Sequence, residues 1–204
     1  VNLGRRELDI PITFNPISLV QKAKANQKVD RPCSDEDWER LLELSLTAYP
    51  KGNRTDEERP LHFMKQIMIF ARETLMRQAE LFRLRKRDID FAKGTALISE
   101  TKNDSPRRIG LSPKAIQILH NLPTTIDGRY FPVRDRFQFY AHWSVLTKLG
   151  DVDISFHTLR HLGATALIYK QGWSIAEVQA QGGWKTLTAL QRYLDIRGEE
   201  LATK

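Results

Sequence analysis

The stretch from Phe156 to Tyr193 carries side chains whose types and spacing could cut a phosphodiester bond. It contains His157 and Arg160, three residues apart, then Trp184 and, nine residues later, Tyr193. A tyrosine that attacks a DNA phosphate forms a covalent phosphotyrosine, which divides one difficult transfer into two easier steps. The non-bridging oxygens gain negative charge in the transition state, and fixed donors aimed at them supply much of the acceleration. Such a site therefore needs cationic donors around the phosphate.

Arginine suits this task, because its planar guanidinium pairs with phosphate in a bidentate manner and keeps its charge. Arg160 is one candidate, and a second is Arg77, which has Glu80 three residues after it. On helical spacing Arg77 and Glu80 lie on one face, so the carboxylate could orient the guanidinium. The local alternative is a surface ion pair worth only tenths of a kcal/mol. Judged locally, that alternative is the simpler interpretation.

Lys102 lies in a predicted hairpin between two short strands. A hairpin tip can reach into a groove, and an ammonium group there can give a proton to a departing 5′ oxygen. The local alternative is a solvated loop lysine, and the hairpin sequence alone favours it. Lys102 is a candidate catalytic residue only as part of the larger pattern to which it belongs.

That larger pattern resembles the signature of the tyrosine recombinases, the phage integrase family. The matching residues follow in order and with the right spacing from about Arg31 to Tyr193: Arg77 with Glu80, Leu84 and Asp88-Ile89-Asp90, Lys102, His157-x-x-Arg160, Trp184 and Tyr193. Two positions depart from the commonest pattern: Thr74-Leu75 stands where Thr-Gly is frequent, and Gly183-Trp184 stands where Gly-His is frequent. Both variants resemble Cre-type members, in which an indole takes the place of the imidazole.

The resemblance implies a role for each matched residue. Tyr193 would attack the scissile phosphate, and Lys102 would protonate the leaving 5′ hydroxyl. His157 would assist proton transfer at the nucleophile and the phosphate. The non-bridging oxygens would be held by Arg77, Arg160 and Trp184. The resemblance implies neither ATP nor a metal ion, and the chain has neither a Walker-type glycine-rich loop nor a clustered Cys/His ligand set.

The implied function is a site-specific DNA recombinase or integrase that works on double-stranded DNA through a 3′-phosphotyrosine intermediate. Recombination would require a homo-tetramer on two duplexes, whereas an isolated domain could be a monomer that only nicks and reseals. A type IB topoisomerase-like enzyme would use the same tyrosine chemistry without exchanging partners. A non-cutting DNA-binding regulator on the same fold is a further alternative, which the six filled positions disfavour.

The composition agrees with a polyanionic partner. The chain has 204 residues with 32 Lys and Arg against 25 Asp and Glu, a net charge of +7, and a pI near 9.6. A basic surface that is merely solvated is the local alternative.

Cys33 is the only cysteine, which excludes an internal disulfide and favours a reducing compartment. No apolar run approaches the ~18 residues of a membrane span. The resemblance implies a cytoplasmic, nucleoid-associated protein encoded by a bacterium or phage.

The elements that must position these residues are mainly helical. Helical periodicity or capping signals predict helices that begin at Ser34, Leu61, Thr74, Ser112, Arg134, Thr158, Ser174 and Thr186. Short strands are predicted at 89–91, 95–100 and 107–111. The fold class is therefore α+β, mainly α with a small antiparallel β-sheet. Residues 1–30 are predicted to be an interdomain linker or the end of a missing N-terminal domain, because they carry Pro11, Pro16 and a polar run with little sustained period. Residues 31–204 are predicted to be the catalytic domain.

The apolar residues of these helices predict the core. One predicted buried stripe comprises Trp38, Leu41, Leu42 and Leu46. A second contains Phe139, Tyr140, Trp143 and Leu146, an aromatic set that is more often core than a surface for stacking bases. Leu187, Leu190 and Leu194 are expected to anchor the helix that bears Tyr193, and His161 is interpreted as a buried structural histidine.

Overall fold

The computed structural model describes residues 33–47, 63–99, 106–131, 133 and 136–191. The chain divides into two units, Val1–Asp30 and Arg31–Lys204, and every described residue belongs to the second. The predicted assignment of residues 1–30 to a linker or domain end falls outside the described residues and stays a prediction.

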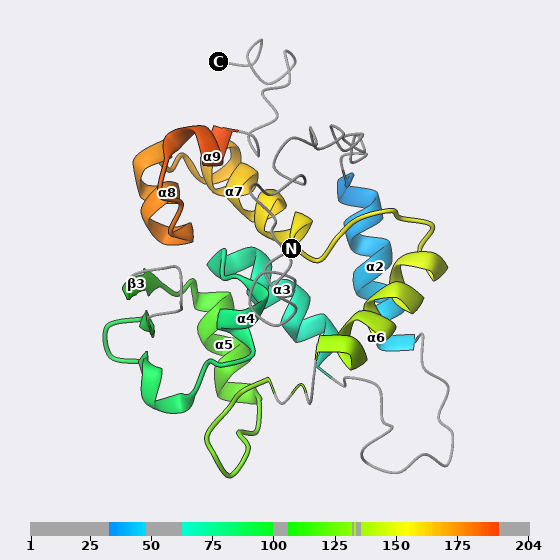
Figure 1. The fold of residues 1–204 in the computed structure, drawn as a ribbon, viewed down its shortest axis with the longest axis horizontal. Helices are drawn as coiled ribbons and strands as arrows, with labels where there is room; N and C mark the ends of the chain where they lie inside the picture. Colours follow the sequence, from blue (N-terminus) through cyan, green and yellow to red (C-terminus); the bar gives the residue numbers. More distant parts are fainter. Residues whose placement is uncertain (1–32, 48–62, 100–105, 132, 134–135, 192–204) are drawn as a thin grey trace, which may run out of the picture. The chain divides into compact units, whose positions relative to one another are not determined.

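Helices make up most of the described chain (Figure 1). They are α2 (Asp35–Thr47), α3 (Met64–Thr74), α4 (Gln78–Leu81), the 3-10 helix η2 (Lys86–Asp88), α5 (Pro113–Asn121), α6 (Arg136–Leu149), α7 (Thr158–Gln171), α8 (Ile175–Gly182) and α9 (Leu187–Gln191). The strands are β1 (Ile89–Asp90), β2 (Thr95–Ile98) and β3 (Arg107–Gly110), which form one antiparallel sheet in the order β1-β2-β3. The predicted fold class is confirmed. None of the helices in the described ranges is long and apolar enough to cross a membrane.

Most of the predicted helix ends carry the capping groups that the sequence indicated. The hydroxyl groups of Ser34, Ser112 and Ser174 each accept a hydrogen bond from the backbone N–H three residues later. This satisfies donors at the start of α2, α5 and α8 that would otherwise lack an intrahelical partner. At the other end of α7, Gly172 takes the left-handed conformation with φ of 73°, as expected of a helix-terminating glycine.

Helix α3 lies at the centre of the packing and contacts α7, α5 and α2 (Figure 1). Its buried residues recur at helical spacing: Met64, Ile67, Met68, Phe70, Ala71 and Thr74. The approach of α7 to α3 depends on Gly163, because a Cβ at this position would lie 2.1 Å from the carbonyl oxygen of Arg72. A backbone oxygen cannot move aside easily, so only glycine allows this separation.

A second, smaller cluster of buried side chains joins α7, α8 and α9 to the turn that follows α3. Its members are Leu75, Ala164, Leu167, Val178, Trp184 and Leu190. Leu190 is fully buried, which confirms its predicted interior position in α9. Because this cluster fixes Trp184 against α7, it determines the distance between the α8–α9 turn and the residues at the start of α7.

The segment before Arg77 differs from its prediction. Thr74 was expected to cap a helix that contains Arg77 in its first turn, but Thr74 is the last residue of α3. Its hydroxyl donates to the carbonyl of Phe70 at 2.6 Å inside α3, and Leu75 then ends the helix with φ of 56°. Arg77 is consequently the N-cap of the short helix α4.

Three predicted core residues are exposed. Leu46 is 64% exposed, Tyr140 43% and Leu187 44%. Tyr140 follows Phe139, which takes the interior position; because an α-helix turns by about 100° per residue, the two cannot both face the core. Leu46 is the last residue but one of α2. Leu187 is the first residue of α9, where the helix has only begun to pack. Leu194 lies outside the described residues.

Candidate functional site

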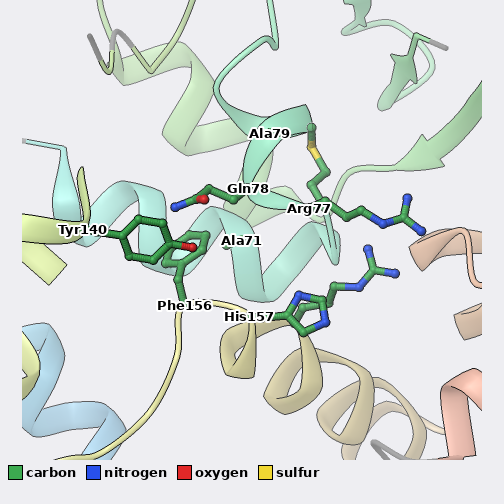
Figure 2. A pocket seen from close by; sticks show the side chains of 9 residues that line it. Ala71, Arg77, Gln78, Ala79, Tyr140, Phe156 and His157 are labelled. Carbon is green, nitrogen blue, oxygen red and sulfur yellow. The ribbon is translucent and has the colours of Figure 1, made fainter. Parts of the chain in front are cut away.

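Arg77, His157 and Arg160 line one pocket of about 240 Å³, although they come from two separate parts of the chain (Figure 2). Arg77 is the N-cap of α4, His157 is the N-cap of α7 and Arg160 lies in the first turn of α7. The positive end of the α7 dipole therefore adds to the two guanidinium charges. The pocket is suited to an anion.

The guanidinium of Arg77 is held from two sides. Its Nη1 donates to Glu80 Oε1 at 2.9 Å, and its Nη2 donates to the carbonyl oxygen of Gly183 at 3.0 Å. Glu80 also accepts from the backbone N–H of Arg77 at 2.8 Å. The predicted orientation of Arg77 by Glu80 thus has a geometric basis, and the side chain of Glu80 is only 2% exposed, unlike a surface ion pair.

Glu80 has a second cationic partner, Arg107, which the sequence pattern did not indicate. Both terminal nitrogens of Arg107, on β3, donate to the Glu80 carboxylate at 2.8 Å. Burial alone raises the pKa of Glu80, but the hydrogen bonds and positive charges of Arg107 and then Arg77 outweigh it and hold the pKa below 4.5. Glu80 is therefore ionised at neutral pH.

Arg160 is almost completely buried, with 2% of its surface exposed. Its Nη1 donates to the carbonyl of Leu75 at 2.6 Å, and its Nη2 donates to that of Gly182 at 2.8 Å. Its Cζ lies 3.9 Å from the centroid of the Trp184 ring, a cation–π arrangement. These contacts fix the guanidinium before any ligand binds.

Residues 181–183, the C-terminal end of α8 with its cap Gly183, contact all three arginines; they are named the 181–183 turn. Each of its three successive carbonyl oxygens accepts a hydrogen bond from a different guanidinium. The pairs are Arg107 with Gln181 at 3.4 Å, Arg160 with Gly182 at 2.8 Å, and Arg77 with Gly183 at 3.0 Å. The turn is thus a shared support for the cationic groups, and Trp184 follows directly after it.

His157 lines the same pocket as Arg77 and Arg160 and is exposed to solvent. Partial removal from water, and then the charges of Arg160 and Arg77, hold its pKa below 6.5. Its ring meets that of His161 edge to face, with 4.8 Å between the ring centroids. Burial, followed by the charges of His157 and Arg160, lowers the pKa of His161 to about 3. Both imidazoles are therefore neutral at pH 7.

The other side of the pocket is less polar. Tyr140 and Phe156 lie together there, across from Arg77 and His157 (Figure 2). Tyr140 was predicted to be core, and its aromatic spacing gave no sign that it lines the site. The pocket could therefore accept a group that is anionic at one end and less polar at the other.

Two predicted site residues, Lys102 and Tyr193, lie outside the described residues. The described chain reaches Ser99 after β2 and resumes at Pro106 before β3, and it ends at Gln191 in α9. Of the other predicted residues, the structure brings Arg77, His157 and Arg160 into one pocket, and it stacks Trp184 on Arg160. In the described ranges, no three His, Cys, Asp or Glu side chains are arranged to hold a metal ion.

The sequence carried one signal for Arg107. It follows Pro106 in a predicted strand, next to Arg108, and adjacent strand residues point to opposite faces. This alternation indicates that the side chain of one of the two arginines faces the interior of the domain. The side chain of Arg107 is 13% exposed, whereas Arg108 is exposed.

Comparison with known proteins gives a consistent result. The sequence profile described as "Phage integrase family" matches residues 35–200. The shufflon-specific DNA recombinase of Escherichia coli is 30% identical over 191 residues, which cover 93% of this chain and 46% of that protein. The chain thus spans about half the length of this relative.

Solved structures show the same fold. The catalytic domain of bacteriophage HP1 integrase matches with a TM-score of 0.58 at 16% identity, covering 83% of this chain and 92% of that one. The XerH site-specific recombinase bound to its difH substrate, in a pre-cleavage complex, matches with a TM-score of 0.58 at 22% identity, covering 85% of this chain and 53% of that one.

Proposed function

We propose that this chain, which belongs to the phage integrase family, is the catalytic domain of a site-specific recombinase that cuts and rejoins double-stranded DNA. The observation that carries the proposal is the pocket shared by Arg77, His157 and Arg160. Two fixed guanidinium groups beside a neutral imidazole are suited to a phosphodiester, because the arginines can hold its non-bridging oxygens while the imidazole accepts a proton.

In the proposed reaction the phenol oxygen of Tyr193 attacks the scissile phosphorus, and the bond from phosphorus to the 5′ oxygen breaks. The phenol proton passes to His157, and Lys102 protonates the departing 5′ oxygen. The product is a 3′-phosphotyrosine with a free 5′ hydroxyl. Rejoining is the reverse attack by a 5′ hydroxyl, which restores the phosphodiester and the tyrosine without an external energy source.

Arg77, Arg160 and Trp184 stabilise the charge on the phosphate oxygens in this scheme. A guanidinium has five N–H groups, so each arginine can keep its carbonyl contacts in the 181–183 turn and still donate to a phosphate oxygen. Because these donors are in place before DNA binds, little reorganisation is needed during the reaction. The indole N–H of Trp184 would supply a further donor.

The decisive experiment traps the covalent intermediate on a nicked suicide duplex that carries the protein's own recombination site. The wild-type protein is expected to form a covalent adduct, and Tyr193→Phe is expected to abolish it while DNA binding persists. Tyr169→Phe, on α7 and away from the pocket, is the matched control that keeps the adduct. An adduct that survives Tyr193→Phe and disappears in Tyr140→Phe would identify the pocket tyrosine as the nucleophile instead.

We further propose that recombination is carried out by four protomers on two duplexes in the cytoplasm. The same adduct without strand exchange, together with relaxation of supercoiled DNA by a monomer, would instead favour a topoisomerase-like enzyme. Binding without any adduct would favour a regulator. Phosphate contacts release counterions, so binding is expected to weaken steeply as salt increases.

A further inference from the structure

We propose that Arg107 is a positioning residue for DNA cleavage, which acts on the phosphate-binding guanidinium of Arg77 through the Glu80 carboxylate. The inference rests on the proposed function and adds a residue to it. Arg107 is not one of the six residues that match the recombinase signature. Its importance follows from three features of the structure. These are its bidentate hydrogen bonds to Glu80, its packing against the 181–183 turn, and the net charge that it gives to the group of Arg77, Glu80 and Arg107.

The first feature is the bidentate interaction between Arg107 and the Glu80 carboxylate. Arg107 donates from Nη1 and Nη2 to the two carboxylate oxygens of Glu80, both at 2.8 Å. This bidentate geometry fixes the plane of the carboxylate as well as its position. Since Glu80 Oε1 is also the acceptor for Nη1 of Arg77, the orientation of Arg77 depends on how firmly Arg107 holds Glu80.

The second feature is the packing of Arg107 against the turn that holds the other side of Arg77. Gly183, whose carbonyl accepts from Arg77 Nη2, has φ of 70°. A Cβ on Gly183 would lie 2.7 Å from Nε of Arg107. Arg107 Nε also donates to the carbonyl of Gln181 at 3.4 Å. Arg107 therefore touches both supports of the Arg77 guanidinium.

The third feature is charge. Arg77 and Arg107 carry two positive charges and Glu80 one negative charge, so the group of three is cationic. Without Arg107, the buried carboxylate would have Arg77 as its only hydrogen-bonded cation in this group, and the pair would be neutral. Arg77 would then turn toward Glu80, because a buried carboxylate binds its remaining cation strongly. Less positive charge would face the phosphate.

A direct contact between Arg107 and DNA is the competing explanation. Unlike Arg77 and Arg160, Arg107 does not line the pocket that contains His157, and both of its terminal nitrogens donate to the Glu80 carboxylate. Arg108, the next residue of β3, is exposed. It carries the same charge on the opposite face of the strand, which makes it the matched control.

The test measures single-turnover cleavage of a suicide duplex at saturating protein, where the amplitude counts competent molecules and the rate constant reports the chemistry. Arg107→Ala is expected to slow cleavage on the order of 10- to 100-fold, as misplacement of a catalytic group does, with little loss of amplitude. Arg108→Ala is expected to keep the wild-type rate constant. Glu80→Gln is expected to slow cleavage as well.

Arg107→Lys keeps the positive charge but cannot form the bidentate interaction with Glu80, so its rate constant is expected to lie between those of wild type and Arg107→Ala. This variant also serves if Arg107→Ala does not fold. The proposal is overturned if the Arg107 variants lose amplitude at an unchanged rate constant, since that is a purely structural effect. It is equally overturned if Glu80→Gln or Arg107→Lys cleaves at the wild-type rate. A wild-type protein that forms no adduct would refute the proposed function itself.

Discussion

The guanidinium of Arg160 stacks on the Trp184 ring, with its Cζ 3.9 Å from the ring centroid, and both residues are nearly buried. Arg160 comes from the start of α7 and Trp184 from the turn after α8. The stack therefore connects a predicted phosphate ligand to the element that leads into α9. The tryptophan has a structural task here in addition to the N–H that it can offer a phosphate.

Replacing Trp184 should separate these two tasks. Trp184→Ala is expected to lower the free energy of unfolding by about 3 to 5 kcal/mol, the usual cost of removing a large buried aromatic. Trp184→Phe keeps a ring over Arg160 but loses the N–H, so it should retain more stability while slowing cleavage. Urea denaturation and adduct formation measure the two effects. Equal stability of Trp184→Ala and wild type would contradict the packing role.

Glu80 should make the stability of the domain depend on acid pH. Its pKa is lowered in the folded protein from 4.5, so its ionised form favours folding above that value. This contribution should be lost as the pH falls from about 4.5 through the folded pKa. Glu80→Gln should cost about 1 to 3 kcal/mol near neutral pH, because it leaves the partly buried guanidinium groups of Arg77 and Arg107 without their carboxylate. Urea denaturation should show the difference between the two proteins shrinking below pH 4.5; a constant difference would contradict it.

The sequence predicted the order of helices and strands well, because most of their ends are marked by local chemistry. Ser34, Ser112 and Ser174 cap their helices through bonds to residues three positions away. The exception is Thr74, whose hydroxyl donates back to Phe70 inside α3 and accepts from the backbone N–H of Met76 at 3.4 Å, but does not cap α4, whose N-cap is Arg77. A threonine at a helix junction can end one helix or cap the next, and tertiary packing decides between them.

The site was predictable only in part. The family pattern selected Arg77, His157 and Arg160, which share a pocket, but it could not reveal that Arg107 and Arg77 share one carboxylate. That contact joins a residue of β3 to one of α4 that lies 27 positions earlier in the chain, and no spacing rule along the chain encodes it. Tyr140 was misassigned for a related reason: an aromatic residue beside a cavity has the same helical spacing as one in the core.

Gly163 should be intolerant of even the smallest side chain. The added Cβ of Gly163→Ala would lie 2.1 Å from the carbonyl oxygen of Arg72 and 2.5 Å from Leu75 Cδ2, so α7 would have to move away from α3. We expect a loss of about 1 to 3 kcal/mol in the free energy of unfolding, typical of an overpacked core, and slower cleavage because Arg160 moves with α7.

Gly172→Ala is the comparison for that experiment. A Cβ there meets no atom within 4 Å, so the cost comes only from the positive φ of 73° and should be about 1 kcal/mol. Thermal or urea denaturation ranks the two variants. If Gly163→Ala is no less stable than Gly172→Ala, the close approach of the two helices is not what requires glycine.

The rate of cleavage should depend on the protonation of His157. Its pKa lies below 6.5, so the imidazole is neutral at pH 7 and can accept the phenol proton. The single-turnover rate should therefore stay high as the pH falls to about 6.5 and decline only at lower pH, where His157 becomes protonated. His157→Gln should be slower and should lack this acid limb. His161→Gln is the control for a titrating neighbour: the pKa of His161 is about 3, so its removal should leave the inflection in place. A profile that rises toward acid would mean that His157 acts as a proton donor instead.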